Sequence, residues 1–302
     1  MQLLHVQTHH ASPSNTETLL AHKLFNRNLK LPYENVAPMN AWRLLKLETQ
    51  NAYMNMAIDE AALTANAAQK VPNTLRLYRW NPSAASIGKF QNPENELQLD
   101  NCRKLGVSVI RRITGGGTVY HDSQDEVTYS LIVKTRDLGV TDIADAYSKV
   151  YTGIKDALRI LGVTADFNEG DAKNCPNLTV KGKKISGSAQ ARKSNTVLQH
   201  GTLLLNVDLE KMFTLLRVPW AKNLQEVVSV AEKRITSVKN ELGHAVSAET
   251  AANALASGFQ NALKIELETG ELSPFERKLA ERLAKEKYAT DQWNLNGKSP
   301  VG

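Results

Sequence analysis

The chain of 302 residues is poor in cysteine: it has only Cys102 and Cys175, which lie far apart in the sequence. Neither belongs to a CxxC or Cys/His spacing, which argues against a structural zinc site and gives no disulfide framework. The sequence also lacks an apolar run long enough to span a bilayer, and its N-terminus lacks the pattern of a secretory signal. These absences favour a cytoplasmic protein that does not enter a membrane.

Hydrophobic residues make up 42% of the chain and charged residues 23%, as in a globular protein with a sizeable core. The net charge of +6 and the pI near 9.1 suit an acidic partner, such as a nucleotide or an acidic protein. Glycine and serine interrupt the densest basic cluster, which runs from Lys181 to Lys193. We therefore expect a ligand loop there and no nucleic-acid surface.

Hydrophobic periodicity predicts an α+β fold, with mixed β-sheets flanked by helices. Residues 1–40 are polar and form an N-terminal arm to which we assign no role, and the folded domain is expected over 41–302. Asp59 and Glu60 are expected in the early turns of a helix, where the helix dipole favours acids. Expected strands lie at 42–49, 74–80, 85–90, 107–110, 127–134, 184–185 and 197–205. Expected helices lie at 55–68, 97–105, 143–161, 236–242, 248–262 and 274–287, and a further helix starts at Asp208.

The stretch RRITGGGTVYHD at 111–122 joins a short strand to a second strand-like run. Its three consecutive glycines, Gly115, Gly116 and Gly117, suit a sharp turn whose backbone N–H groups approach an anionic ligand. Arg111 and Arg112 place two guanidinium groups, suited to phosphate or carboxylate, beside that turn. A tight hairpin with a basic shoulder is the alternative interpretation.

A second informative stretch, VKGKKISGSAQARKSNTVLQHGTLLL, covers residues 180–205. It predicts a hairpin that turns at Lys181 and Gly182 and leads to Lys184 and a run of small residues. Small residues on a strand let a ligand lie against the backbone, and a neighbouring lysine can meet a phosphate or an acyl carbonyl.

Together, the two stretches resemble the biotin/lipoate protein ligase family, specifically the lipoate–protein ligases and the related octanoyltransferases. The run from Arg111 to Asp122 is similar to the family's adenylate-binding segment, and the run from Lys184 to Ala189 is similar to the segment with its essential lysine. Lesser matches are SIGKFQNP at 86–93, QHGTLL at 199–204, the MAIDEAAL helix and KYATDQWN at 287–294. The resemblance covers about residues 42–294 and implies the family's catalytic-domain fold.

The resemblance implies a lipoate–protein ligase that activates lipoate with ATP and Mg²⁺ to lipoyl-AMP and then acylates a lysine of an acceptor protein. Such chemistry needs fixed positive donors more than a nucleophile, because negative charge concentrates on the phosphate. Lys184 is then the catalytic residue, and no protein ligand for Mg²⁺ can be assigned. Expected contacts to the acyl-adenylate come from Arg111, Arg112, Gly115, Gly116, Gly117, His121, Asp122, Ser186, Gly187, Ala189, His200 and Gly201.

The expected acceptor is a lipoyl-domain protein or a glycine-cleavage H protein. Full-length bacterial ligases of this kind carry a C-terminal accessory domain, and in some archaeal ligases a separate small protein supplies it. The chain stops soon after Trp293, so we expect an accessory subunit for full activity.

Three alternatives remain open at this stage. Octanoyltransferases with a cysteine nucleophile carry it shortly before the same lysine segment, and Cys175 precedes Lys184 at a somewhat shorter spacing. Such enzymes form an acyl-thioester and need no ATP. The chain could also be a non-catalytic binding subunit. Finally, His121 and His200 could be structural, Lys184 could be a solvated hairpin charge and Asp122 could begin a turn.

Overall fold

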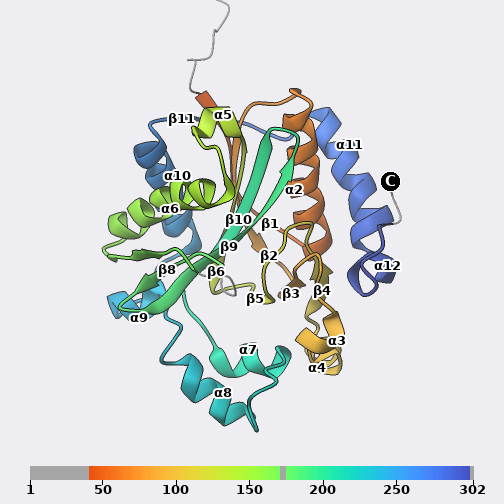
Figure 1. Ribbon diagram of the computed structural model, residues 1–302, viewed down its shortest axis with the longest axis vertical. Helices are drawn as coiled ribbons and strands as arrows, with labels where there is room; N and C mark the ends of the chain where they lie inside the picture. Colours follow the sequence, from red (N-terminus) through yellow and green to blue (C-terminus); the bar gives the residue numbers. More distant parts are fainter. Residues whose placement is uncertain (1–40, 171–174, 300–302) are drawn as a thin grey trace, which may run out of the picture. The chain divides into compact units, whose positions relative to one another are not determined.

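The computed structural model describes residues 41–170 and 175–299 (Figure 1). The predicted N-terminal arm at 1–40 lies outside the described residues. Two sheets form the framework, and helices cover both faces of the larger one. This arrangement confirms the predicted α+β class with mixed sheets flanked by helices.

The larger sheet has eight strands and contains both parallel and antiparallel pairs. In spatial order its strands are β11 (Glu266–Thr269), β1 (Ala41–Gln50), β2 (Thr74–Trp80), β6 (Glu126–Lys134), β10 (Thr196–Leu204), β9 (Lys183–Lys193), β8 (Asn177–Val180) and β7 (Asp166–Asn168). The smaller sheet consists of β4 (Ser108–Arg111), β3 (Ala84–Ile87) and β5 (Val119–His121). It carries the two stretches that flank the glycine turn.

Alternation along β6 divides its side chains between the two faces of the large sheet. Val127, Tyr129 and Leu131 pack into the main core with α6 (Ile143–Ile160) and α10 (Ala248–Leu263). Ile132 packs on the other face against α2 (Ala52–Ala67), and α11 (Pro274–Leu283) packs against α2 in turn. Figure 1 shows α6 and α10 on one side of the sheet and α2 on the other. The polar residues between the α2 face and the small sheet are therefore enclosed.

The remaining helices are short. They are α3 (Pro93–Glu96), α4 (Leu99–Lys104), α5 (Thr135–Leu138), α7 (Leu209–Leu215), α8 (Leu224–Ala231), α9 (Val238–Leu242), the π-helix η1 (Ala284–Tyr288) and α12 (Asp291–Asn294). The helix expected to start at Asp208 is α7, because the Asp208 side chain accepts from the N–H of Lys211 and caps the helix.

Several predicted elements differ in extent. Helix α2 starts at Ala52, three residues early, because Asn51 is its N-cap, and Asp59 therefore lies in its second turn, buried. The strand expected at 184–185 extends through the small-residue segment as far as Lys193, since that segment pairs with β10. The helix expected at 274–287 changes to a π-helix at Ala284. Strands β7 and β11 and helix α8 were not predicted.

Candidate active site

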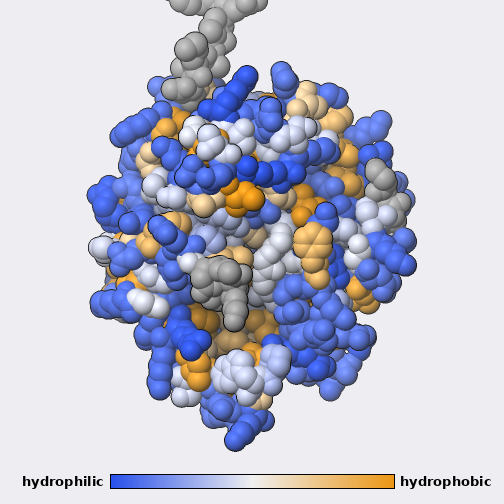
Figure 2. Space-filling model, viewed as in Figure 1, coloured by the Kyte–Doolittle hydropathy of each residue, from blue (hydrophilic) through white to orange (hydrophobic). Residues whose placement is uncertain are grey.

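A cavity of about 310 Å³ lies among β2, β9 and β10 of the large sheet, the glycine turn, and α7. Its apolar lining includes Met56, Trp80, Leu204, Met212 and Phe213. Figure 2 shows apolar side chains gathered in the lower centre of the visible face, where α7 lies. The combination of an apolar hollow and a few polar groups is typical of a small-molecule site.

Lys184 lies on β9 and lines this cavity. Two backbone hydrogen bonds fix the main chain of Lys184: its N–H donates to the carbonyl of Arg234, and its carbonyl accepts from the N–H of Thr236. A Cβ at Gly187 would lie 2.7 Å from the Lys184 ammonium nitrogen, so the missing side chain at Gly187 makes room for that ammonium. The residue is exposed, yet the protein around its ammonium lowers the pKa of Lys184, chiefly through desolvation. A lowered pKa suits an amine that exchanges protons.

Cys175 lines the same cavity and is exposed. The Pro176 carbonyl next to it accepts a hydrogen bond from the Tyr151 hydroxyl at 2.9 Å, and the Cys175 carbonyl accepts one from Asn177. Charge on the Cys175 sulfur raises the pKa of Lys184, against the larger effect of desolvation. The thiol is therefore close enough to the amine to influence the ionisation of Lys184.

Arg112 reaches into the cavity below the glycine turn. Its Nη2 donates to the carbonyls of Gly115 and Gly117, at 3.0 and 2.9 Å, and so holds the turn. Gly116 between them has a φ of +86°, a left-handed conformation that favours glycine. Burial lowers the pKa of Arg112 to about 10, which leaves the guanidinium charged at neutral pH.

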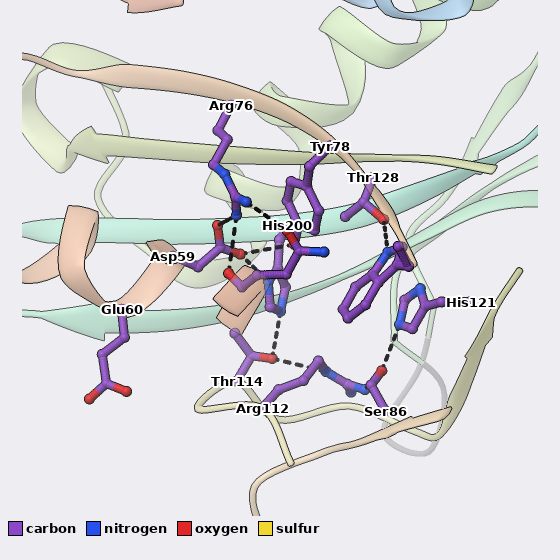
Figure 3. A network of polar contacts seen from close by, with 12 residues as sticks. Asp59, Glu60, Arg76, Tyr78, Ser86, Arg112, Thr114, His121, Thr128 and His200 are labelled. Atoms are coloured by element: carbon purple, nitrogen blue, oxygen red, sulfur yellow. Dashed lines mark hydrogen bonds and ion pairs between the residues drawn. The ribbon is translucent and has the colours of Figure 1, made fainter. Parts of the chain in front are cut away.

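Behind Arg112, a buried network surrounds Asp59 (Figure 3). Asp59 accepts from Arg76 at 2.9 Å, from the Tyr78 hydroxyl at 3.0 Å and from His200 Nδ1 at 2.9 Å. Burial alone would raise the pKa of Asp59, but His200 and Arg76 lower it, so the group is a carboxylate. Desolvation lowers the pKa of His200, which keeps its imidazole neutral. His200 Nε2 lies 2.9 Å from the Thr114 hydroxyl.

A second buried network surrounds His121. Its Nδ1 lies 2.7 Å from Glu126, and its Nε2 lies 2.8 Å from the Ser86 hydroxyl. The ring also stacks on Trp80, with ring centroids 4.1 Å apart. Ser86 in turn accepts from Nη1 of Arg112 at 2.6 Å (Figure 3). The two networks therefore meet at one guanidinium.

The structure brings most of the predicted site residues to the cavity. Those that line it are Arg112, Gly116, Gly117, His121, Lys184, Ser186, Gly187, Ala189, His200, Gly201 and the alternative nucleophile Cys175. Both histidines are also buried and hydrogen-bonded, as the structural alternative expected. A Cβ at Gly201 would lie 2.4 Å from the Gly187 carbonyl oxygen, so glycine is required where β9 and β10 pair at the cavity wall.

Arg111, Asp122 and Gly115 do not line this cavity. The Arg111 guanidinium donates to six backbone carbonyls, three of them in the segment from Trp293 to Leu295, and so ties that segment to the small sheet. Asp122 accepts from Lys211, from Tyr120 and from the N–H of Gln124, so it begins a turn. Gly115 contributes its carbonyl to Arg112.

Sequence reasoning did not single out Asp59, Ser86, Thr114 and Glu126 as site residues. Ser86 opens the SIGKFQNP match and Asp59 lies in the MAIDEAAL match, so both stood in segments that the resemblance marked. Thr114 lies within the glycine stretch itself, and Glu126 carries no sequence signal beyond its closeness to that stretch. Within residues 41–170 and 175–299, no group of three or more His, Cys, Asp or Glu side chains could hold a metal ion.

Comparison with known proteins places the chain in a family. A profile described as the lipoyl protein ligase A/B catalytic domain matches residues 51–260. The Octanoyltransferase LipM of Kyrpidia tusciae is 38% identical over 274 residues, covering 85% of this chain and 99% of that protein. The LipM of Brevibacillus brevis is 34% identical over 276 residues, with 85% and 99% covered.

Two solved structures have the same fold. A bi-partite lipoate protein ligase from Thermoplasma acidophilum, described with its E2 lipoyl domain, superposes with a TM-score of 0.74 at 29% identity, covering 86% of this chain and 98% of that one. A lipoate-protein ligase A bound with ATP also has a TM-score of 0.74 at 29% identity, with 85% and 100% covered. These neighbours confirm the predicted catalytic-domain fold.

The relatives overturn the predicted activity. The expectation of an ATP-dependent lipoate–protein ligase is wrong, because the more similar proteins, matched over almost their whole length, are octanoyltransferases. The relatives do not confirm the expected need for ATP and Mg²⁺ or the lipoyl-AMP intermediate, although a more distant structural neighbour is described as bound with ATP. What the profile, the relatives and the fold agree on is that this chain is an enzyme of the lipoyl protein ligase A/B catalytic domain family.

Proposed function

We propose that this chain transfers an octanoyl group from a thioester donor to a lysine of a lipoyl-domain-type acceptor protein, with Cys175 as the nucleophile. The observation that carries this proposal is that Cys175 and Lys184 line the same cavity, where charge on the Cys175 sulfur raises the pKa of Lys184 against the larger effect of desolvation. The choice of octanoyl as the acyl group rests on the names of the relatives, which are octanoyltransferases. A thiol beside an amine of lowered pKa is an arrangement suited to nucleophilic catalysis.

In the first step, the neutral amine of Lys184 accepts the proton of the Cys175 thiol. The thiolate attacks the carbonyl carbon of the donor thioester, and the new carbon–sulfur bond replaces the bond to the donor's sulfur. The donor leaves as a thiolate and takes the proton from the Lys184 ammonium. The product is an octanoyl-Cys175 thioester and a free donor thiol.

In the second step, the neutral ε-amine of the acceptor lysine attacks the octanoyl-Cys175 carbonyl. The carbon–nitrogen bond forms and Cys175 leaves as a thiolate. Lys184 accepts the proton that the amine loses and passes it to the Cys175 thiolate. Neither step consumes ATP, because the thioester already supplies an activated acyl group. This is why the proposed reaction contains no adenylate.

The apolar lining of the cavity provides the place for the acyl chain. Burial of about six methylene groups stabilises a bound octanoyl chain by about 5 kcal/mol before the costs of association. Met56, Trp80 and Phe213 are suited to contact this chain. We propose that the carbonyl end of the chain lies against the polar lining residues Cys175, Lys184 and Arg112.

The acceptor remains the kind of protein expected from the sequence, a lipoyl domain or an H-type protein, and the archaeal neighbour is described with such a domain. The predicted accessory subunit followed from the ligase interpretation, and the proposed transfer does not include one. In the part of the chain that the structure describes, no helix is long and apolar enough to cross a membrane. We propose a cytoplasmic enzyme that acts on two protein partners.

The test compares acylation of an apo lipoyl-domain protein from octanoyl-carrier protein without ATP and from free lipoate with Mg-ATP. The variants are Cys175→Ala and Lys184→Ala, with Cys102→Ala as the matched control, because Cys102 is buried in a separate core cluster. We expect transfer without ATP that Cys175→Ala abolishes and Cys102→Ala preserves. Intact-mass analysis should also find octanoyl on Cys175 when the acceptor is left out. Transfer that survives Cys175→Ala would show that this thiol is not the nucleophile.

A further inference from the structure

Two chains of hydrogen bonds converge on the guanidinium of Arg112, and each consists of a carboxylate, an imidazole and a hydroxyl. Figure 3 shows the imidazole and the hydroxyl of both chains and the carboxylate of Asp59. The aspartate chain is made of Asp59, His200 and Thr114. The glutamate chain is made of Glu126, His121 and Ser86. All six residues are buried.

In the aspartate chain, each hydrogen bond has one possible direction. The charged Asp59 carboxylate can only accept, so His200 Nδ1 carries the proton and Nε2 is an acceptor. The Thr114 hydroxyl must then donate to Nε2 and offer its oxygen to Nε of Arg112, which lies 3.3 Å away. We assign this tautomer from the network.

The glutamate chain repeats this pattern from the other side of the guanidinium. Glu126 accepts from His121 Nδ1 at 2.7 Å, and also from the Thr128 hydroxyl at 3.0 Å. Assigning His121 the same tautomer as His200 makes Nε2 the acceptor from Ser86, whose oxygen accepts from Nη1 of Arg112 at 2.6 Å. Thus two hydroxyls, each fixed in rotation by an imidazole, hold two different nitrogens of one arginine.

The interactions of Arg112 leave one N–H for a ligand. An arginine has five N–H donors, and the contacts to Thr114, Ser86, Gly115 and Gly117 use four. The fifth belongs to Nη1 and has no partner among the described residues. No carboxylate within the described residues pairs directly with this buried guanidinium, so neutral hydroxyls and carbonyls fix its orientation.

We propose that the aspartate and glutamate chains are positioning groups, which hold Arg112 so that its remaining N–H meets the acyl carbonyl oxygen during transfer. This inference rests on the proposed octanoyl transfer. When Cys175 attacks the thioester, the carbonyl oxygen becomes an oxyanion in the cavity that both Cys175 and Arg112 line. A charged donor that is already oriented stabilises this oxyanion without reorganisation, which favours the transition state over the bound substrate.

The experiment removes each hydroxyl in turn, by Thr114→Val and Ser86→Ala. Thr114→Ser keeps the hydroxyl and serves as the rescue variant. Thr74→Val is the matched control, because the buried Thr74 hydroxyl likewise accepts from an arginine, Arg43, but lies outside the cavity. Single-turnover acylation of Cys175 by octanoyl-carrier protein is followed by intact-mass analysis over a range of donor concentrations, with the folded fraction measured by circular dichroism.

We expect Thr114→Val and Ser86→Ala to lower the maximal acylation rate about 10- to 100-fold, with little change in the donor concentration at half-maximal rate. Thr114→Ser should recover most of the rate, and Thr74→Val should lower only the stability. If the hydroxyl variants lose no more rate than Thr74→Val, the chains are structural and the inference fails while the octanoyl transfer stands. If the wild-type chain is not acylated at all, the proposed function fails and this inference fails with it.

Discussion

Gly187 offers a way to move the Lys184 amine without removing it. A Cβ at Gly187 would lie 2.6 Å from Cε and 2.7 Å from Nζ of Lys184, which is well inside van der Waals contact. The Gly187→Ala variant must therefore displace the end of this side chain by about 1 Å, since carbon atoms in contact lie about 3.5–4.0 Å apart. The displacement moves the proton acceptor relative to Cys175.

The expected cost to the fold is small. The overlapped atoms are the mobile end of a lysine, and alanine in a strand is about 0.5–1 kcal/mol more favourable than glycine. The free energy of unfolding should therefore change by less than about 1 kcal/mol. The rate should change far more, because a misplacement of about 1 Å in a reacting group lowers rates about 100-fold.

The assay is the single-turnover acylation of Cys175, run beside urea unfolding of the same preparation. Gly270→Ala is the matched control: its Cβ would meet the Arg43 side chain at 2.9 Å, a similar overlap with a cationic residue outside the cavity. We expect Gly187→Ala to acylate slowly while it remains as stable as the wild type, and Gly270→Ala to acylate normally. If Cys175 in the Gly187→Ala variant is acylated at the wild-type rate, Lys184 is not the proton acceptor.

Three further predictions concern pH, Arg111 and Asp122. Because desolvation lowers the pKa of Lys184 and the neutral amine is the active form, the rate of Cys175 acylation should rise with pH and level off below the range of an exposed lysine; a pH–rate profile checks this. Arg111→Ala should lower the free energy of unfolding by about 2–4 kcal/mol, because it leaves several buried carbonyls unpaired; urea unfolding measures this loss. The same variant should change the rate of octanoyl transfer per folded molecule little, which the transfer assay checks. Asp122→Asn breaks a partly exposed pair with Lys211, so it should cost about 1 kcal/mol or less and preserve transfer in the same assays.

Most of the fold could be predicted because its long elements have regular patterns. The amphipathic α6 and the apolar β6 were predicted within one or two residues of their bounds. The short edge strands β7 and β11 were missed, since three or four residues give no measurable alternation. Helix α8 was also missed, although Asn223 caps it and Glu226 lies in its first turn, which are recognisable start signals.

The candidate site was predictable as far as the motifs extended, and the limit is visible at Arg111 and Arg112. Successive residues at a strand end point to opposite sides, so only one of the two could reach the cavity. Asp59 is a different case: its helix was predicted, but its pairing with Arg76 and His200 depends on the approach of β2 and β10, which no local pattern specifies.

The choice between ligase and transferase could not come from the motifs, because their residues do not depend on the leaving group. Lys184, Arg112 and the glycine turn suit any reaction in which negative charge develops at an acyl group, whether the acyl group is joined to phosphate or to sulfur. Only Cys175 distinguishes the two chemistries, and its spacing from Lys184 is somewhat shorter than in the octanoyltransferases that use a cysteine nucleophile. In the structure, β8 pairs with β9 in a hairpin that places Asn177 opposite Gly187, and Cys175 lines the cavity at this spacing. The thiol two residues before Asn177 therefore returns to the glycine against which the Lys184 ammonium lies.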